Sequence, residues 1–200
     1  MDDFFTTTSL APGIAVFGFV MLMFSAALTL SRDRESALFS RLLTTPLKPN
    51  DFAAGYSVPY VPVAIIQAVA IFGIGLFFGL ETAGSIALVA LILLIMALMF
   101  IALGMITGAL FTQKQVPFVY MAILLLAIFG GAWVDVEAIG GAFSTVGEWF
   151  PFTHGLDAAR DVMIDGAGFD AIASDLYWVV GYTIVIVGLA VVAFRRRMLE

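Results

Sequence analysis

Long apolar stretches separated by short polar segments make up most of this 200-residue sequence. A helix needs about 20 predominantly apolar residues to cross a bilayer. The stretches that approach or exceed this length cover, approximately, residues 11–30, 52–80, 85–111, 116–134 and 176–194. In lipid, a helix satisfies all its backbone groups within one segment. The pattern therefore predicts an all-α polytopic membrane helix bundle that forms a single transmembrane domain over residues 1–200.

Prolines and glycines indicate where these predicted helices bend and where they approach one another. Pro12 lies at the start of the first stretch, where a missing N–H costs little. Pro59 and Pro62, near the start of the second stretch, predict a kinked or broken first turn. Gly104 and Gly108 have the four-residue spacing that allows two helix backbones to approach closely. We give the same interpretation to three glycines near the end of the second stretch, Gly73, Gly75 and Gly79.

The longest polar interruption in the first two thirds of the chain is the segment 31–49, SRDRESALFSRLLTTPLKP. It contains four of the nine basic residues. Its apolar side chains recur at three- and four-residue spacing, which predicts an amphipathic helix over residues 31–46 that Pro46 and Pro49 end. Such a helix between two spans lies at the cytoplasmic surface. Two interpretations stay open: a loop that only sets the topology, and an element that docks a cytoplasmic partner.

The segment 135–175 differs in kind from the rest of the chain. It is moderately apolar, and it contains eight acidic residues but a single arginine. It is too interrupted to span the membrane and too apolar for a free loop, so we expect interfacial or re-entrant helices there. Tyr177 and Trp178, which follow it, are interpreted as an aromatic anchor at the membrane interface.

The basic residues decide the expected orientation. If the segment 31–49 is cytoplasmic, eight of the nine basic residues lie on the cytoplasmic side and most of the acidic residues lie outside. The positive-inside rule then predicts an external N-terminus and a cytoplasmic C-terminus in the cell membrane. Because only ten residues precede the first predicted span, we also expect that an earlier span is missing from this chain.

Composition supports a membrane protein and narrows its chemistry. The chain is 62% hydrophobic and 12% charged, whereas soluble domains are about half apolar and about a quarter charged. It has no cysteine, which excludes disulfides and thiolate metal sites. It has no phosphate-binding GxxxxGK[ST] loop, so it is not itself an ATPase. The near absence of ionisable residues in the predicted spans argues against an ion-coupled transporter. Gln67, the main polar exception, either bonds to a neighbouring helix or lines a substrate path.

Three aspartates, Asp157, Asp161 and Asp165, recur at four-residue spacing. On one helix face they could hold Mg²⁺ for a membrane-embedded transferase, or they could form a solvated acidic face. Arg160 lies among them and is expected to pair with Asp157 or Asp161. His154 is the single histidine, and we interpret it as a capping or interfacial residue rather than a proton shuttle.

Two motifs resemble the membrane subunit of ABC-2 type transporters, the permeases of type V exporters. The first is RDRESALFSRLL at residues 32–43, followed by Thr44-Thr45-Pro46. It is similar to the family's cytoplasmic stretch of alternating Arg and Glu before a Thr-Pro turn. The second is FPFTHGLDAAR at residues 150–160, which is similar to the family's Leu-Pro-x-Thr segment and the following helix that ends in arginine. The resemblance covers essentially the whole chain.

The resemblance implies the permease subunit of an ATP-driven exporter, which moves a lipid-like, drug-like or polymer substrate by alternating access. It implies a cytoplasmic ABC ATPase subunit that holds ATP and Mg, a second permease copy or homologue, and membrane lipid as partners, with no nucleic acid. No catalytic site, cofactor or metal is expected in this chain. Family members usually have six spans, so this chain resembles one that lacks the first.

The resemblance also implies two sets of site residues. The coupling helix would dock the ATPase through Arg34, Glu35, Leu38, Arg41, Leu42, Thr45 and Pro46. An external gate or re-entrant region would include Phe150, Pro151, Thr153 and Arg160. The alternatives are an ATPase-independent membrane protein (a small channel, an assembly subunit or a nonfunctional permease fragment) and the membrane-embedded transferase.

Overall fold

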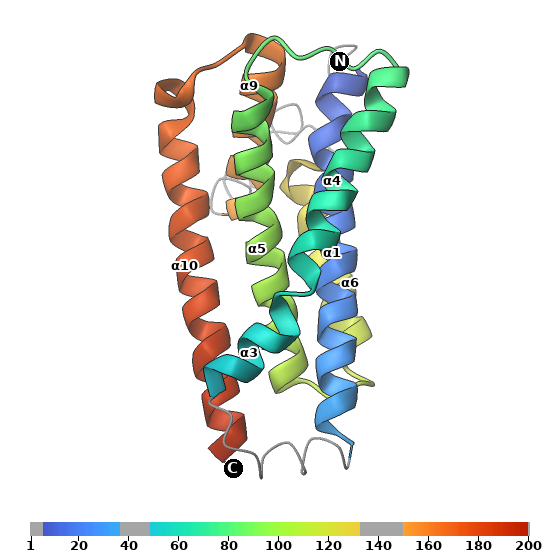
Figure 1. Ribbon diagram of the computed structural model, residues 1–200, viewed down its shortest axis with the longest axis vertical. Coiled ribbons are helices and arrows are strands. Elements are labelled where there is room, and N and C mark those ends of the chain that lie inside the picture. The colour runs from blue at the N-terminus through green and yellow to red at the C-terminus, as the bar shows by residue number, and fades with distance from the viewer. Residues whose placement is uncertain (1–5, 37–48, 133–149, 200) are drawn as a thin grey trace.

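The computed structural model describes residues 6–36, 49–132 and 150–199, and all its regular elements in these ranges are helices (Figure 1). In chain order they are α1 (Thr7–Arg34), α3 (Pro49–Ser57), α4 (Tyr60–Phe77), α5 (Ile86–Leu110), α6 (Val116–Ala127), η2 (Ile128–Ala132), α9 (Pro151–Asp165) and α10 (Phe169–Leu199). The prediction of an all-α helix bundle is therefore confirmed.

Helices α1 and α5 form the centre of the bundle. In the 18-residue apolar stretch of each helix, about half of the residues are buried, 56% in α1 and 50% in α5. They meet at Gly104 and Gly108, because a β-carbon at Gly104 would lie 2.6 Å from the carbonyl oxygen of Met23 and one at Gly108 would lie 2.8 Å from that of Ala27. The prediction that these two glycines allow close helix packing is confirmed. In contrast, Gly73 has no neighbour within 4 Å of its would-be β-carbon.

The flanking helices expose their apolar side chains. In the corresponding 18-residue apolar stretches, only 11% of the residues are buried in the segment Asp51–Phe77 and 22% in α10. Water would disfavour such continuous apolar surfaces, whereas lipid does not. In the described ranges, four helical segments are long and apolar enough to cross a membrane: α1, Asp51–Phe77 (most of α3 together with α4), α5 and α10. The predicted span 116–134 corresponds to the shorter apolar helix Val116–Ala132.

The second predicted span is broken near its start, as its prolines predict. Helix α3 ends at Ser57, and α4 begins at Tyr60 after Pro59. Pro62 then falls in the first turn of α4, where its missing N–H removes no intrahelical bond. Figure 1 shows α3 crossing obliquely near the end of the molecule where α10 finishes, while α4 continues toward the other end.

The glycines at the end of α4 have a different role from the close packing that their positions predicted. Gly79 has φ +79°, a conformation that glycine adopts without a β-carbon penalty. Its N–H donates to the carbonyl of Leu76, and the N–H of Leu80 donates to that of Gly75. This pair of bonds is a Schellman motif that ends the helix. The packing prediction for Gly73 and Gly79 was therefore wrong.

Several boundaries differ from the expected ones. Helix α1 begins at Thr7, because the side chain of Thr6 accepts a hydrogen bond from the N–H of Ser9 and caps it. Pro12 therefore lies inside α1 rather than at its start. Residues 31–34 form the last turn of α1, so the structure corrects the prediction that a separate amphipathic helix begins at residue 31. Likewise, residues 169–175 belong to α10 rather than to the predicted re-entrant region.

Candidate functional site

The predicted docking residues that the structure describes, Arg34 and Glu35, contact this chain itself. The Arg34 guanidinium donates hydrogen bonds to the carbonyls of Ala109 and Phe111, the second at 2.9 Å. Glu35 accepts one from the backbone N–H of Gln113 at 3.0 Å. Both side chains therefore tie the end of α1 to the end of α5. The other predicted docking residues lie outside the described residues, and their role stays a prediction: Leu38, Arg41, Leu42, Thr45 and Pro46.

The four residues of the predicted external gate or re-entrant region lie at the beginning and middle of α9. Phe150 precedes the helix, and Pro151 is its first residue. The Thr153 hydroxyl donates to the carbonyl of Gly130 at 3.0 Å. Arg160 donates through Nη2 to the carbonyl of Gly131 at 2.8 Å. The structure therefore brings this predicted group against the end of the α6–η2 helix.

The sequence of η2 explains why these bonds are needed. Gly130 and Gly131 leave helical geometry, and Gly131 has φ +99°. A helix that stops leaves carbonyls without intrahelical donors, and Gly130 and Gly131 are buried. Thr153 and Arg160 are seven residues apart, which is about two helical turns and places them on one face of α9. Helix α9 thus supplies the donors that the broken helix lacks.

Arg160 also reaches a third helix. Its Nε donates to the carbonyl of Ser9 in α1 at 3.2 Å, and its side chain is only 12% exposed. The sequence predicted pairing with Asp157 or Asp161, and the pair with Asp157 is present at 3.8 Å, although the Asp157 side chain is 51% exposed. A half-exposed pair at this distance contributes little to stability. The bonds to backbone carbonyls of α1 and η2 are therefore expected to contribute more to stability than the pair with Asp157.

Aromatic stacking holds the start of α9 against α5. The rings of Phe152 and Phe100 stack with centroids 5.1 Å apart, and Phe150 stacks on Phe152 at 6.1 Å. One turn later Gly155 lies against Met96, whose sulfur would be 2.5 Å from a β-carbon at that position. Together with Thr153 and Arg160, these contacts fix α9 against α1, α5 and η2. We call the group Thr153, Arg160, Gly130 and Gly131 the α9–η2 bracket.

A second cluster joins α9 to α10. His154 Nδ1 lies 2.7 Å from the Asp175 carboxylate, and its ring stacks on Trp178 with centroids 5.4 Å apart. Trp178 in turn stacks on Tyr182. The interpretation of His154 as an interfacial residue missed Asp175 as its partner. Spacing along one helix could not reveal it, because the two residues lie on different helices.

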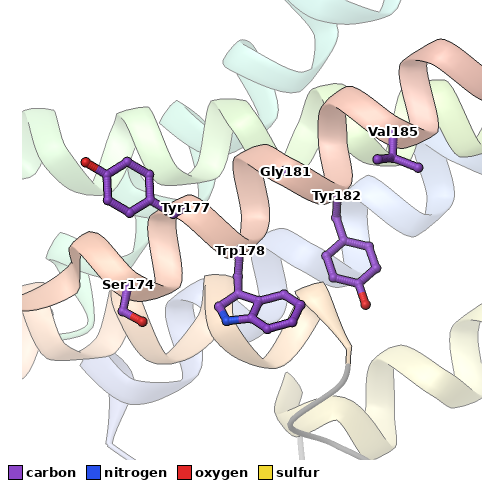
Figure 2. Close-up of a pocket in the computed structure, with 6 residues that line it drawn as sticks. All are labelled: Ser174, Tyr177, Trp178, Gly181, Tyr182 and Val185. Atoms are coloured by element: carbon purple, nitrogen blue, oxygen red, sulfur yellow. The ribbon is translucent and has the colours of Figure 1, made fainter.

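An open cavity of about 510 Å³ lies along this part of α10. It is lined by Ser174, Tyr177, Trp178, Gly181, Tyr182 and Val185. Figure 2 shows the rings of Trp178 and Tyr182 side by side along one flank of the helix, while Tyr177 extends to another side. Such a surface of aromatic rings with a few hydroxyls suits the membrane interface.

The aspartate array gives no support to the transferase alternative. In the described ranges, no group of three His, Cys, Asp or Glu side chains is arranged to hold a metal ion. Asp157 instead faces Arg160.

Replacing Thr153 with valine is expected to lower the free energy of unfolding by about 1 kcal/mol, because the buried carbonyl of Gly130 loses a donor. Valine has nearly the same shape, so packing changes little. Thermal unfolding in detergent micelles, followed by circular dichroism, measures the effect. Thr153→Ser keeps a hydroxyl and is the control; equal losses in the two variants would mean that the hydrogen bond is unimportant.

Comparison with known proteins gives consistent matches. The family model described as ABC-2 type transporter matches residues 2–164. The "Probable multidrug ABC transporter permease YbhR" of Escherichia coli K12 is 25% identical over 189 residues, which cover 93% of this chain and 51% of that protein. The "Linearmycin resistance permease protein LnrN" of Bacillus subtilis 168 is 22% identical over 167 residues, which cover 80% of this chain and 42% of that protein.

The chain therefore spans about half the length of the curated relatives it matches. No solved structure matches it.

Proposed function

The chain belongs to the ABC-2 type transporter family, and on that premise we propose that it is the permease subunit of an ATP-driven exporter. It is a multi-pass membrane protein and a transporter subunit. The family match over residues 2–164 is the observation that carries the proposal. ATP hydrolysis would take place in a separate cytoplasmic ABC ATPase, which binds ATP and Mg.

We propose that two permease copies, or this chain and a homologue, pair with two ATPase subunits and alternate between inward- and outward-facing states. The exposed apolar flanks of α4 and α10 leave surface for such a second copy as well as for lipid. The coupling helix was predicted over residues 31–46, and the part of it that follows α1, the coupling segment, would receive the ATPase.

The orientation follows from charge. Basic residues gather at the end of the bundle where α1 and α10 finish, at Arg32, Arg34 and the arginine run 195–197. By contrast, α9 and the start of α10 contain five aspartates and a single arginine, Arg160. By the positive-inside rule the first end is cytoplasmic, which places the α9–η2 bracket toward the external side.

For the substrate, we propose a drug-like or lipid-like amphipathic molecule. Two relatives are named for multidrug transport and for linearmycin resistance. The apolar helices support this choice, because a path lined by apolar side chains suits a substrate with a large apolar part. Drug susceptibility of cells that express the chain together with its ATPase, compared with cells that lack it, measures this directly.

Affinity purification of the tagged chain from its own host tests the core of the proposal. We expect an ABC ATPase to co-purify with the wild-type chain. Leu38→Asp and Arg41→Glu are expected to abolish co-purification, since each places a wrong charge on the predicted docking surface.

Lys114→Glu is the matched control, because Lys114 is an exposed basic residue on the short turn between α5 and α6, outside the predicted coupling segment. If no ATPase is recovered with the wild-type chain, the proposed function is wrong. If Leu38→Asp and Arg41→Glu retain the ATPase as the control does, only the predicted location of the docking surface is wrong.

A further inference from the structure

Three consecutive side chains at the end of α1 each bind a different part of the cytoplasmic end of the bundle. Asp33 accepts a hydrogen bond from the Tyr56 hydroxyl of α3 at 2.9 Å. Arg34 binds the last carbonyls of α5, and Glu35 binds the turn between α5 and α6. The last turn of α1 is itself closed by bonds from the N–H groups of Glu35 and Ser36 to preceding carbonyls. We call residues 33–35 the α1 joint.

The bonds to α5 are complementary. In a continuing helix the N–H of Gln113 would donate to the carbonyl of Ala109, four residues earlier. Helix α5 ends at Leu110, so that bond is absent and both groups need other partners. Arg34 donates to the Ala109 carbonyl, and Glu35 accepts from the Gln113 N–H. Two adjacent side chains of α1 thus replace the bond that α5 loses where it ends.

Charge reinforces this arrangement. The carboxyl end of a helix carries a partial negative charge, which favours a cation. Arg34 places its guanidinium there, and a planar guanidinium can donate to two carbonyls at once. Arg32 differs from Arg34: its side chain is exposed, and it makes no polar contact in the described part of the chain. The two arginines of one helical turn therefore have different environments.

We propose that the α1 joint makes α1, α3 and α5 move as one body, so that a displacement of the coupling segment after residue 36 is transmitted to α5. The inference rests on the proposed function, since the displacement would come from the ATPase. It assigns Arg34 and Glu35 to transmission within the permease instead of to docking. They are positioning residues, and the ATPase would bind beyond them.

The chain has no cysteine, so one introduced thiol can report movement at the far end of α5. Ser85 precedes α5, is exposed, and makes no side-chain capping bond, which makes Ser85→Cys a mild substitution. The readout is the rate at which a membrane-impermeant maleimide labels the introduced thiol in the complex with the co-purified ATPase, with and without ATP. In the chain that carries only Ser85→Cys we expect ATP to change this rate.

Arg34→Met and Glu35→Leu are expected to reduce the ATP-dependent change in labelling rate by about tenfold, a typical magnitude for the loss of coupling between two sites. Recovery of the ATPase should remain unchanged. Tyr56→Phe removes one hydroxyl with little risk to folding and is expected to give a smaller reduction. Arg32→Met is the matched control and should respond like the parent.

Glu35→Gln separates the two roles of this residue. Glutamine keeps an oxygen that accepts from the Gln113 N–H but has no charge. If Glu35 acts through this hydrogen bond, the ATP-dependent change in labelling rate should be nearly normal in Glu35→Gln. A loss of ATPase recovery in Glu35→Gln would instead assign the carboxylate to docking and overturn the inference. Normal ATP-dependent labelling in both Arg34→Met and Glu35→Leu would overturn it as well. If no ATPase accompanies even the wild-type chain, the proposed function fails first, and the joint fails with it.

Discussion

Replacing Arg160 with methionine is expected to lower the free energy of unfolding by about 3 kcal/mol, because the carbonyls of Ser9 and Gly131 lose a charged donor. Both bonds join elements that are distant in the sequence, at 3.2 and 2.8 Å. The Arg160 side chain is largely buried, so water does not readily replace it. Methionine retains most of the apolar stem, which limits the loss of packing. Thermal unfolding in detergent micelles measures the effect.

Two further variants isolate the cause. Asp157→Asn removes the charge of a half-exposed partner at 3.8 Å, and we expect a loss below about 1 kcal/mol. Arg160→Lys keeps the charge but cannot reproduce a fork of donors aimed at two carbonyls, so an intermediate loss is expected. If Arg160→Met and Asp157→Asn were equally stable, the ion pair rather than the carbonyl bonds would account for what Arg160 contributes.

Hydropathy and glycine or proline positions predicted the helical framework because these signals are local. A spanning helix must be apolar along its own length, so the spans were visible in the sequence. The break before α4 follows from the backbone chemistry of Pro59 itself. The close approach at Gly104 and Gly108 was also predictable, since four-residue spacing places both on one helix face. For Gly79 the same reasoning failed, because a glycine at a helix end serves a turn.

The polar contacts of the candidate site were less predictable, since each joins distant segments. Thr153 and Arg160 were identified through a family motif, yet nothing in that motif indicated Gly130 and Gly131 as their partners. The amphipathic pattern of the segment 31–46 indicated a surface helix. The last turn of α1 instead extends to Arg34, where the free carbonyls of α5 give its guanidinium a better partner than water. Whether Arg34 binds water or these carbonyls depends on where another helix, α5, ends, and the sequence around Arg34 does not show this.

The internal contacts of α9 also explain why a segment with so many acids is ordered. Its apolar face carries Phe152, Leu156 and Val162, which are buried, while aspartates such as Asp157 lie on the other side. The α9–η2 bracket adds bonds that an isolated surface helix would lack. Helix α9 is therefore part of the bundle core toward the proposed external side, and a transport cycle that opens this side must break the bracket or move α9, α1 and η2 together.

The double variant Gly104→Ala/Gly108→Ala is expected to lower the free energy of unfolding by about 3 kcal/mol, because overpacking of a tight contact costs about 1–3 kcal/mol at each position. The new methyl groups would lie 2.6 Å from the Met23 carbonyl oxygen and 2.8 Å from that of Ala27. These neighbours are backbone atoms, so no side chain can rotate away, and α1 and α5 must separate.

The chain provides a matched control in α10. Gly181 and Gly188 also lie in a helix that is long and apolar enough to cross a membrane, and a β-carbon at either position would meet nothing within 4 Å. Gly181→Ala/Gly188→Ala should therefore be neutral or stabilising by up to about 1 kcal/mol per site, since alanine favours the helix. The same gain in helix preference applies at Gly104 and Gly108, so the difference between the two double variants measures the α1–α5 contact alone. Equal midpoints of thermal unfolding for the two proteins would show that α1 and α5 are not in backbone contact.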